Sequence, residues 1–213
     1  MDSKARNLAA ALLILLLGFP ATGMAQGDQK SQALPPALFQ GKDLIRELQK
    51  GGYVIYLRHA SSDTTQEDSD LSDFKNCAKQ RNLSEAGRKE AKLIGEAVKR
   101  LKINISSVTS SPFCRCMDTA TLAFGKAAPS SALYFAIGVS PQERQKLTES
   151  LKKMLGTQPP AGTNAAIVSH TANLQEAAGI WPKPEGVAIV FKPEGEGKFK
   201  YAGAVLPTDW PNY

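Results

Sequence analysis

Short apolar runs alternate with amphipathic helical segments along most of this chain, and this alternation constrains the fold more than any other feature of the sequence. Residues 53–57 and 165–168 form such apolar runs, which are typical of buried strands. Strands that alternate with helices form a mostly parallel sheet with helices on both faces. We therefore predict a three-layer α/β/α sandwich. The expected strands cover residues 53–58, 108–110, 133–136, 165–169, 187–191 and 198–203, and the expected helices cover residues 42–50, 83–102, 112–124 and 141–155.

Residues 1–25 have the features of a secretory signal peptide. Lys4 and Arg6 precede an apolar stretch over residues 8–19, and small residues surround the expected cleavage point after Ala25. An uncleaved membrane anchor is the alternative, but a membrane span needs about 20 apolar residues and this stretch is shorter. We predict that the protein is periplasmic or secreted. The expected parts are a signal peptide over residues 1–25, a flexible leader over residues 26–40 and one domain over residues 41–213.

The charge pattern argues against nucleic acid as a partner. The formal net charge is +6, but the Lys and Arg residues are scattered through helical stretches and mixed with Glu. This pattern favours a solvated, mildly basic surface with a weak preference for anionic small molecules. After residue 25 no apolar segment is long enough to span a bilayer, so we expect no stable membrane insertion of the processed protein.

The chain has 3 cysteines, and an exported protein meets an oxidising compartment in which disulfides form. We predict a bond between Cys77 and Cys114, which leaves Cys116 unpaired. Because Cys114 directly precedes Arg115, this bond would fix the backbone that presents the arginine. In the chain-entropy model it would contribute about 3 to 4 kcal/mol to stability. Three buried free thiols are the alternative.

The chain has only 2 histidines, and each follows a predicted strand. His59 follows the run that begins at residue 53, and His170 follows the run that begins at residue 165. In open α/β sheets, binding and catalytic groups gather at the carboxyl ends of the strands. One such histidine is more often an ordinary loop residue, but two in matching positions indicate an active site.

Four stretches resemble motifs of the histidine phosphatase superfamily, which is also called the phosphoglycerate-mutase-like family. They occur in the order of the family's motifs and span about residues 53–174, which makes the resemblance far more specific than a lone Arg-His pair. The family's nucleophile motif Arg-His-Gly corresponds here to Arg58-His59-Ala60, and its pattern Leu-Thr-x-x-Gly corresponds to Leu83-Ser84-Glu85-Ala86-Gly87. The family's pattern Ser-x-x-x-Arg-x-x-x-Thr-Ala corresponds to residues 111–120, in which the arginine is Arg115. The family's late histidine corresponds to His170. The resemblance implies a phosphoglycerate-mutase-like fold.

The resemblance also implies a phosphoric monoester hydrolase that forms a phosphohistidine on His59. Arg58 and Arg115 are the expected phosphate ligands, because a guanidinium is always charged and its planar fork of donors matches phosphate oxygens. His170 is expected to contact the same phosphoryl group. This chemistry requires no metal ion or other cofactor, and the acidic loop after His59 lacks the spacing of a calcium loop.

The leaving oxygen needs a proton, so a carboxylic acid should lie near the site. Glu143 is the favoured candidate, because it lies at about the separation from Arg115 that the mutase-like branch of the family uses for its acid. Asp118, Asp63 and Glu176 are the alternatives. Asp118 shares a predicted helix with Arg115, and the other two follow the histidines closely.

Two positions depart from the family patterns. Ala60 replaces the usual glycine, where a backbone with positive φ would be strained, and Thr171 stands where the acid-phosphatase branch has an acidic residue. The alternative function is therefore a phosphate-binding module of the same fold with weak turnover or none. A mutase is the enzymatic alternative, which export disfavours because phosphoglycerate is a cytoplasmic metabolite.

The expected substrate is a small phosphoester, with an envelope sugar phosphate as one candidate. The polar loop over residues 61–82 is expected to cover the pocket.

Overall fold

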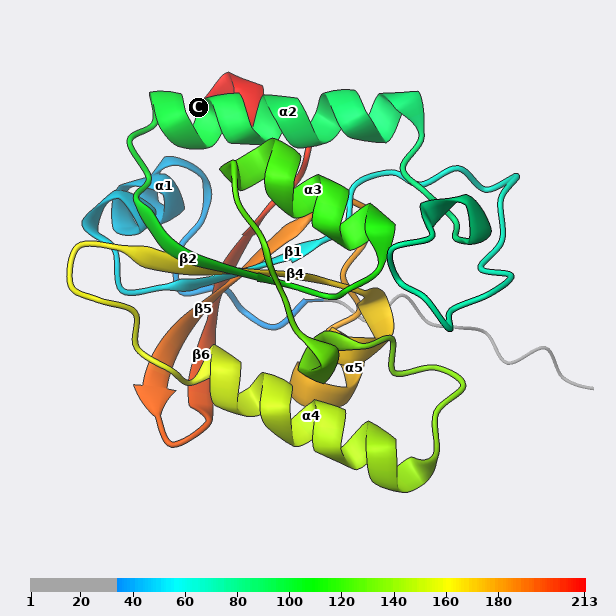
Figure 1. Cartoon of the computed structure of the whole chain (residues 1–213). Helices are drawn as coiled ribbons and strands as arrows, with labels where there is room; N and C mark the ends of the chain where they lie inside the picture. Colours follow the sequence, from blue (N-terminus) through cyan, green and yellow to red (C-terminus); the bar gives the residue numbers. More distant parts are fainter. Residues whose placement is uncertain (1–33) are drawn as a thin grey trace, which may run out of the picture. The chain divides into compact units, whose positions relative to one another are not determined.

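A mixed sheet of six strands runs through the computed structural model, which describes residues 34–213 (Figure 1). The strand order across the sheet is β3-β2-β4-β1-β5-β6. The strands are β1 (Val54–Arg58), β2 (Ile105–Ser110), β3 (Ala128–Pro129), β4 (Asn164–Ser169), β5 (Ala188–Gly195) and β6 (Lys198–Val205). The helices are α1 (Gly41–Lys50), α2 (Glu85–Arg100), α3 (Cys114–Phe124), α4 (Pro141–Leu155) and α5 (Thr171–Ala178), with short 3-10 turns η1 (Cys77–Lys79), η2 (Ser131–Leu133) and η3 (Trp210–Asn212). The predicted signal peptide and the first part of the leader lie outside the described residues.

The central strands are parallel. β1 pairs with β4, β4 with β2, and β2 with β3, all in parallel register. β5 pairs antiparallel with β1 and forms an antiparallel hairpin with β6. Because β1 and β4 are parallel neighbours, their carboxyl ends meet at one edge of the sheet, and the residues that follow the two strands lie close together.

Helices cover both faces of the sheet (Figure 1). Ile55 and Leu57 of β1 belong to the core that α1, α2 and α3 share, whereas Val54 and Tyr56 belong to the core that α4 and α5 share. Burial on both faces explains why this strand has a continuous apolar sequence. The predicted mostly parallel α/β/α sandwich is confirmed. Within residues 34–213, no helix has the length and apolar character that a membrane crossing requires.

Serine side chains cap the first turns of two helices. Ser84 precedes α2 and accepts a hydrogen bond from the backbone N–H of Gly87, and Ser140 precedes α4 and accepts one from the N–H of Glu143. Each serine satisfies an N–H group that the helix itself leaves without a partner, a contribution of about 1 kcal/mol. Gly51 ends α1 with a φ of 80°, a conformation that glycine adopts without strain.

The predicted strand over residues 133–136 is wrong. The turn η2 ends at Leu133, and the sheet gains only the two-residue β3 in this region. The rings of Tyr134 and Phe135 pack against Phe113, with centroids 5.5 and 6.3 Å away. This short apolar run therefore packs against α3 and does not join the sheet. A local apolar pattern alone does not distinguish the two environments. The sequence also gave no prediction of α5.

The segment between β1 and α2 is a long loop, teal in Figure 1, in which η1 is the only helical turn among these fully described residues. Asp63, Asp70 and Asp73 each accept a hydrogen bond from the backbone N–H two positions later, which fixes local turns. A disulfide between Cys77 and Cys114 joins the loop to the first residue of α3. The predicted cysteine pairing is confirmed.

Candidate active site

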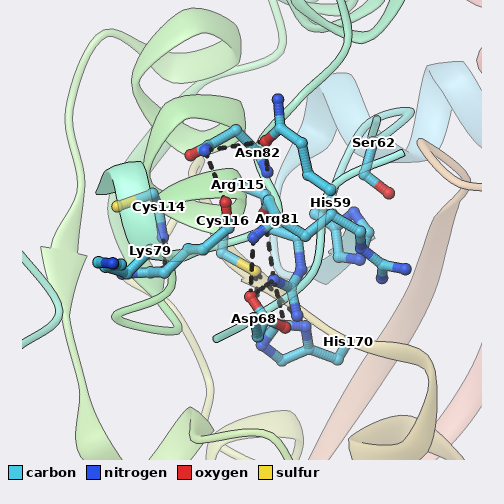
Figure 2. Close-up of polar contacts among 12 residues, drawn as sticks. His59, Ser62, Asp68, Lys79, Arg81, Asn82, Cys114, Arg115, Cys116 and His170 are labelled. Atoms are coloured by element: carbon cyan, nitrogen blue, oxygen red, sulfur yellow. Dashed lines mark hydrogen bonds and ion pairs between the residues drawn. The ribbon is translucent and has the colours of Figure 1, made fainter. Parts of the chain in front are cut away.

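The two histidines lie side by side at the carboxyl ends of β1 and β4. Arg58 is the register partner of Ser169, so His59 and His170 leave the sheet together. Their ring centroids are 5.6 Å apart, and both side chains are buried. Figure 2 shows them with Arg81, Arg115 and Asp68 in one cluster.

The hydrogen bonds of His59 fix its tautomer. Its Nδ1 lies 3.0 Å from the carbonyl oxygen of Ala60. A carbonyl oxygen only accepts, so Nδ1 carries the proton and Nε2 keeps its lone pair. The backbone holds the residue on both sides, because its N–H donates to Ser169 and its carbonyl accepts from Gly186. The ring is therefore oriented with Nε2 available as a nucleophile.

Both histidines are neutral at neutral pH. Burial, with smaller contributions from the positive charges of Arg115, Arg58 and Arg81, lowers the pKa of His59 to about 3. Burial, together with the same arginines, also places the pKa of His170 well below its ordinary value. A neutral imidazole is the form that attacks phosphorus.

His170 is held by aromatic rings and by a serine. Its Nε2 lies 2.9 Å from Ser111 Oγ, and its ring packs against Phe113 and Phe135 with centroids 4.9 and 4.8 Å away. Cys116 Sγ lies 3.6 Å from the same nitrogen. Burial raises the pKa of the Cys116 thiol to about 12, so this free cysteine is no thiolate nucleophile at neutral pH.

Arg58 is oriented from its outer side. Its Nη2 donates to Glu185 Oε1 at 3.0 Å, and its Nη1 donates to the carbonyl of Pro182 at 3.2 Å. Glu185 also accepts hydrogen bonds from the backbone and the hydroxyl of Ser62, and its carboxylate lies 3.9 Å from His59 Nδ1. The buried Nε of Arg58 has no protein partner among the described residues.

Arg115 is oriented in a similar way by the long loop. It lies in the first turn of α3, is 1% exposed, and donates from Nη1 to both oxygens of Asp68 at 3.0 and 3.1 Å. Its guanidinium carbon lies 4.6 Å from the centre of the Phe113 ring. As in Arg58, the buried Nε has no acceptor within the described part of the chain. Each arginine thus has a carboxylate on one side and an unpaired donor on the other.

The sequence reasoning missed three residues of this cluster. Asp68 was only one of several acidic residues in the loop, and Arg81 had no recognised role although it lies just before the Leu83 motif. Glu185 lies on the segment before β5 and gave no signal, because its distance from Arg58 along the chain hides the 3.0 Å contact.

The carboxylates that the sequence suggested as acids lie elsewhere. Glu143 is in the first turn of α4, where its half-exposed carboxylate lies 3.8 Å from Lys146. Asp118 pairs with Arg88, Glu176 lies 3.9 Å from Arg144, and Asp63 accepts from Thr65 in an exposed turn. In the contacts of residues 34–213, none of the four touches a histidine of the site, Arg58 or Arg115. The assignment of Glu143 as the acid stays a prediction.

The alanine after the nucleophile fits its position. Ala60 is fully buried, and its N–H donates to Thr119 Oγ1. Among the described residues other than glycine, positive φ occurs at Lys102 and Glu196, so Ala60 carries no such strain. The glycine of the helix motif has a clear role, since a side chain on Gly87 would meet the carbonyl oxygen of Ser61. Because Gly87 has no side chain, the chain after His59 packs directly on α2.

Within residues 34–213, no group of three or more His, Cys, Asp or Glu residues is arranged to hold a metal ion. The carboxylates nearest the histidines are bound to arginines instead.

Comparisons with known proteins agree with the fold and the motifs. Residues 54–135 match the family described as the histidine phosphatase superfamily (branch 1). No curated protein sequence matches the chain. Three solved structures share the fold. They are an Escherichia coli K-12 protein proposed to be an alpha-ribazole-5'-P phosphatase (TM-score 0.56, 11% identity, 74% of this chain and 98% of that chain), a mycobacterial glucosyl-3-phosphoglycerate phosphatase in complex with VO3 (TM-score 0.52, 11% identity, 72% and 98%), and the protein histidine phosphatase SixA in complex with tungstate (TM-score 0.50, 15% identity, 74% and 98%).

Proposed function

We propose that this chain is a phosphoric monoester hydrolase of the histidine phosphatase superfamily, whose model matches residues 54–135, and that it hydrolyses a small phosphoester through a phosphohistidine on His59. One observation carries the proposal. His59 is neutral, its Nδ1 is held by Ala60, and its Nε2 is left free beside two arginines that have unpaired donors.

The proposed reaction has two steps. In the first, the lone pair of His59 Nε2 attacks phosphorus, the bond from phosphorus to the ester oxygen breaks, and the leaving oxygen takes up a proton. In the second, water attacks the phosphohistidine, the bond from phosphorus to Nε2 breaks, and inorganic phosphate leaves while the lone pair returns to Nε2. Two easier displacements thus replace one difficult hydrolysis.

The arginines supply the electrostatic part of catalysis. Charge in the transition state lies on the three equatorial oxygens of the phosphoryl group, and catalysis is mainly positioning and stabilisation of that charge. Glu185 and Asp68 fix the outer donors of Arg58 and Arg115, so the remaining donors are oriented before substrate binds. His170 is proposed to contact a phosphoryl oxygen.

The structural relatives support a small oxyanion as the ligand. Tungstate and VO3, which occupy two of the related proteins, are oxyanions like phosphate. We propose that the substrate is a small phosphate monoester and that an envelope sugar phosphate is the first candidate, because the N-terminal sequence suggests export. Cell fractionation of the expressed full-length chain tests the export, and accumulation of unprocessed protein in the cytoplasm would contradict it.

The activity is tested with p-nitrophenyl phosphate and a panel of sugar phosphates. The wild-type protein should release phosphate, and a rapid acid-free quench after labelled substrate should trap label on His59. His59→Ala should lose both turnover and label. Wild-type turnover in His59→Ala would overturn the mechanism, whereas phosphate binding with no turnover across the panel would favour the alternative of a binding module.

A further inference from the structure

Arg81 is a third arginine at the site, and it differs from the other two in having no carboxylate partner. Within residues 34–213, Arg58 pairs with Glu185 and Arg115 pairs with Asp68, but Arg81 forms no ion pair. Its Nε is nevertheless buried and has no acceptor in the described part of the chain. A buried donor of a charged group without an acceptor is costly, and an anion bound in the site would supply the acceptor and balance the charge.

The backbone of Arg81 is tied directly to the predicted phosphate ligand Arg115. The carbonyl of Arg81 accepts from Arg115 Nη1 at 3.3 Å, and its N–H donates to Asp68 Oδ1 at 3.0 Å. Asp68 therefore connects the two arginines. The positive charge of Arg81 also acts on both histidines, lowering the pKa of His59 and of His170. Figure 2 shows Arg81 in the same cluster as these side chains.

The residues on either side of Arg81 are anchored, so its position is built into the fold. Gln80 is 2% exposed, accepts from the N–H of Cys114, and donates to the carbonyl of Phe74. The side-chain amide of Asn82 donates to the carbonyls of Cys77 and Gln80. These contacts, together with the disulfide, attach this end of the loop to α3.

We propose that Arg81 is a third phosphate ligand, supplied by the loop of residues 61–82, and that Asp68 is the positioning residue that couples it to Arg115. This inference rests on the proposed function only for the identity of the anion as a phosphoryl group. Each of the three arginines has a buried Nε without an acceptor among the described residues, and these are the donors assigned to the phosphoryl group. A phosphoryl group has three non-bridging oxygens to accept them.

The test measures binding of inorganic phosphate to the purified protein by calorimetry. Arg81→Gln should weaken binding about 10- to 100-fold, the loss expected for one hydrogen bond to a charged group. Arg81→Lys should recover part of the affinity, since it keeps the charge but not the planar fork. Lys79→Gln is the matched control. It removes one positive charge from the same loop, and Figure 2 shows its side chain directed away from the histidines, so its affinity should stay within about twofold of wild type.

Equal affinity of Arg81→Gln and wild type would overturn the inference, as would an equal loss in Lys79→Gln. If Arg81→Gln does not fold, Arg81→Lys decides, and unchanged phosphate affinity in this variant counts against the inference. The assay is independent of turnover. If the wild-type protein binds phosphate through Arg81 but hydrolyses no ester, the third ligand is supported and the proposed function is contradicted. If it hydrolyses esters and the loss of Arg81 has no effect, the proposed function is supported and the third ligand is contradicted. Failure of the wild type to bind phosphate would contradict both.

Discussion

The two sides of the site are held by very different parts of the molecule. We call the first the strand-end half, which consists of Arg58, His59, His170 and Glu185, and the second the loop half, which consists of Asp68, Arg81 and Arg115. Backbone hydrogen bonds of the sheet fix the strand-end half. A disulfide, an ion pair and local turns fix the loop half.

This difference separates two tasks. The nucleophile lies on the sheet, whose parallel strands determine its position and its hydrogen bonds. The loop half places the positive charges of Arg81 and Arg115 near His59, but its geometry depends on contacts that a change of loop sequence can alter. Rigid elements suit atoms that form bonds, and loops suit groups that set affinity and specificity. The following predictions test whether the two halves can be separated in this way.

Apart from loss of the nucleophile itself, the largest effect on turnover is expected from replacing either paired arginine by lysine. Arg115→Lys should lower kcat/KM about 1,000-fold and Arg58→Lys about 100-fold, because lysine loses the planar fork and the completely buried Arg115 is the less adaptable of the two. Steady-state kinetics with p-nitrophenyl phosphate measures both. Arg88→Lys, on the surface pair with Asp118, is the control and should be unchanged. A loss below threefold in both site variants would contradict the assignment of Arg58 and Arg115 as phosphate ligands.

Removal of the disulfide should affect stability and the loop half together. The double variant Cys77→Ser and Cys114→Ser should lose about 3 to 4 kcal/mol of unfolding free energy, since the bond closes a sequence separation of 37 residues. Urea unfolding measures the loss, and phosphate affinity should fall in parallel because the bond anchors the loop to α3. A double variant with wild-type stability would show that other contacts suffice to hold the loop.

Acidification should destabilise the protein through the strand-end half. Burial lowers the pKa of His59 to about 3 in the folded state, against about 6.5 when unfolded, so the unfolded chain binds more protons between these values. The contribution is complete above about pH 6.5 and is lost as the pH falls, by about 2 kcal/mol between pH 7 and pH 5. His170 acts in the same direction.

The pH prediction is checked by urea unfolding at pH 7 and pH 5. The variant His59→Gln, which cannot titrate, should lose about 2 kcal/mol less than wild type over this interval. An identical pH dependence of the two proteins would show that His59 does not carry the effect.

The two halves also differ in how far the sequence predicts them. The positions of His59 and His170 follow from local patterns, because an apolar run defines a strand and its end defines the sheet edge. The contacts of Glu185 with Arg58 and of Asp68 with Arg115 join residues 127 and 47 positions apart. No local periodicity encodes such contacts, and an acidic residue in a polar loop resembles its solvated neighbours. The disulfide was accessible because only three cysteines had to be paired.

The smallest effect is expected at Glu143. Its half-exposed carboxylate lies beside Lys146 in the first turn of α4, so Glu143→Gln should change kcat less than twofold. Asp68→Asn is the comparison from the loop half, and it should lower kcat more strongly because it loosens Arg115. The pH profiles of both variants separate positioning from proton donation. A proton donor at Glu143 would instead show as a large loss of kcat in Glu143→Gln together with loss of the alkaline limb, and would place the acid on α4, outside both halves.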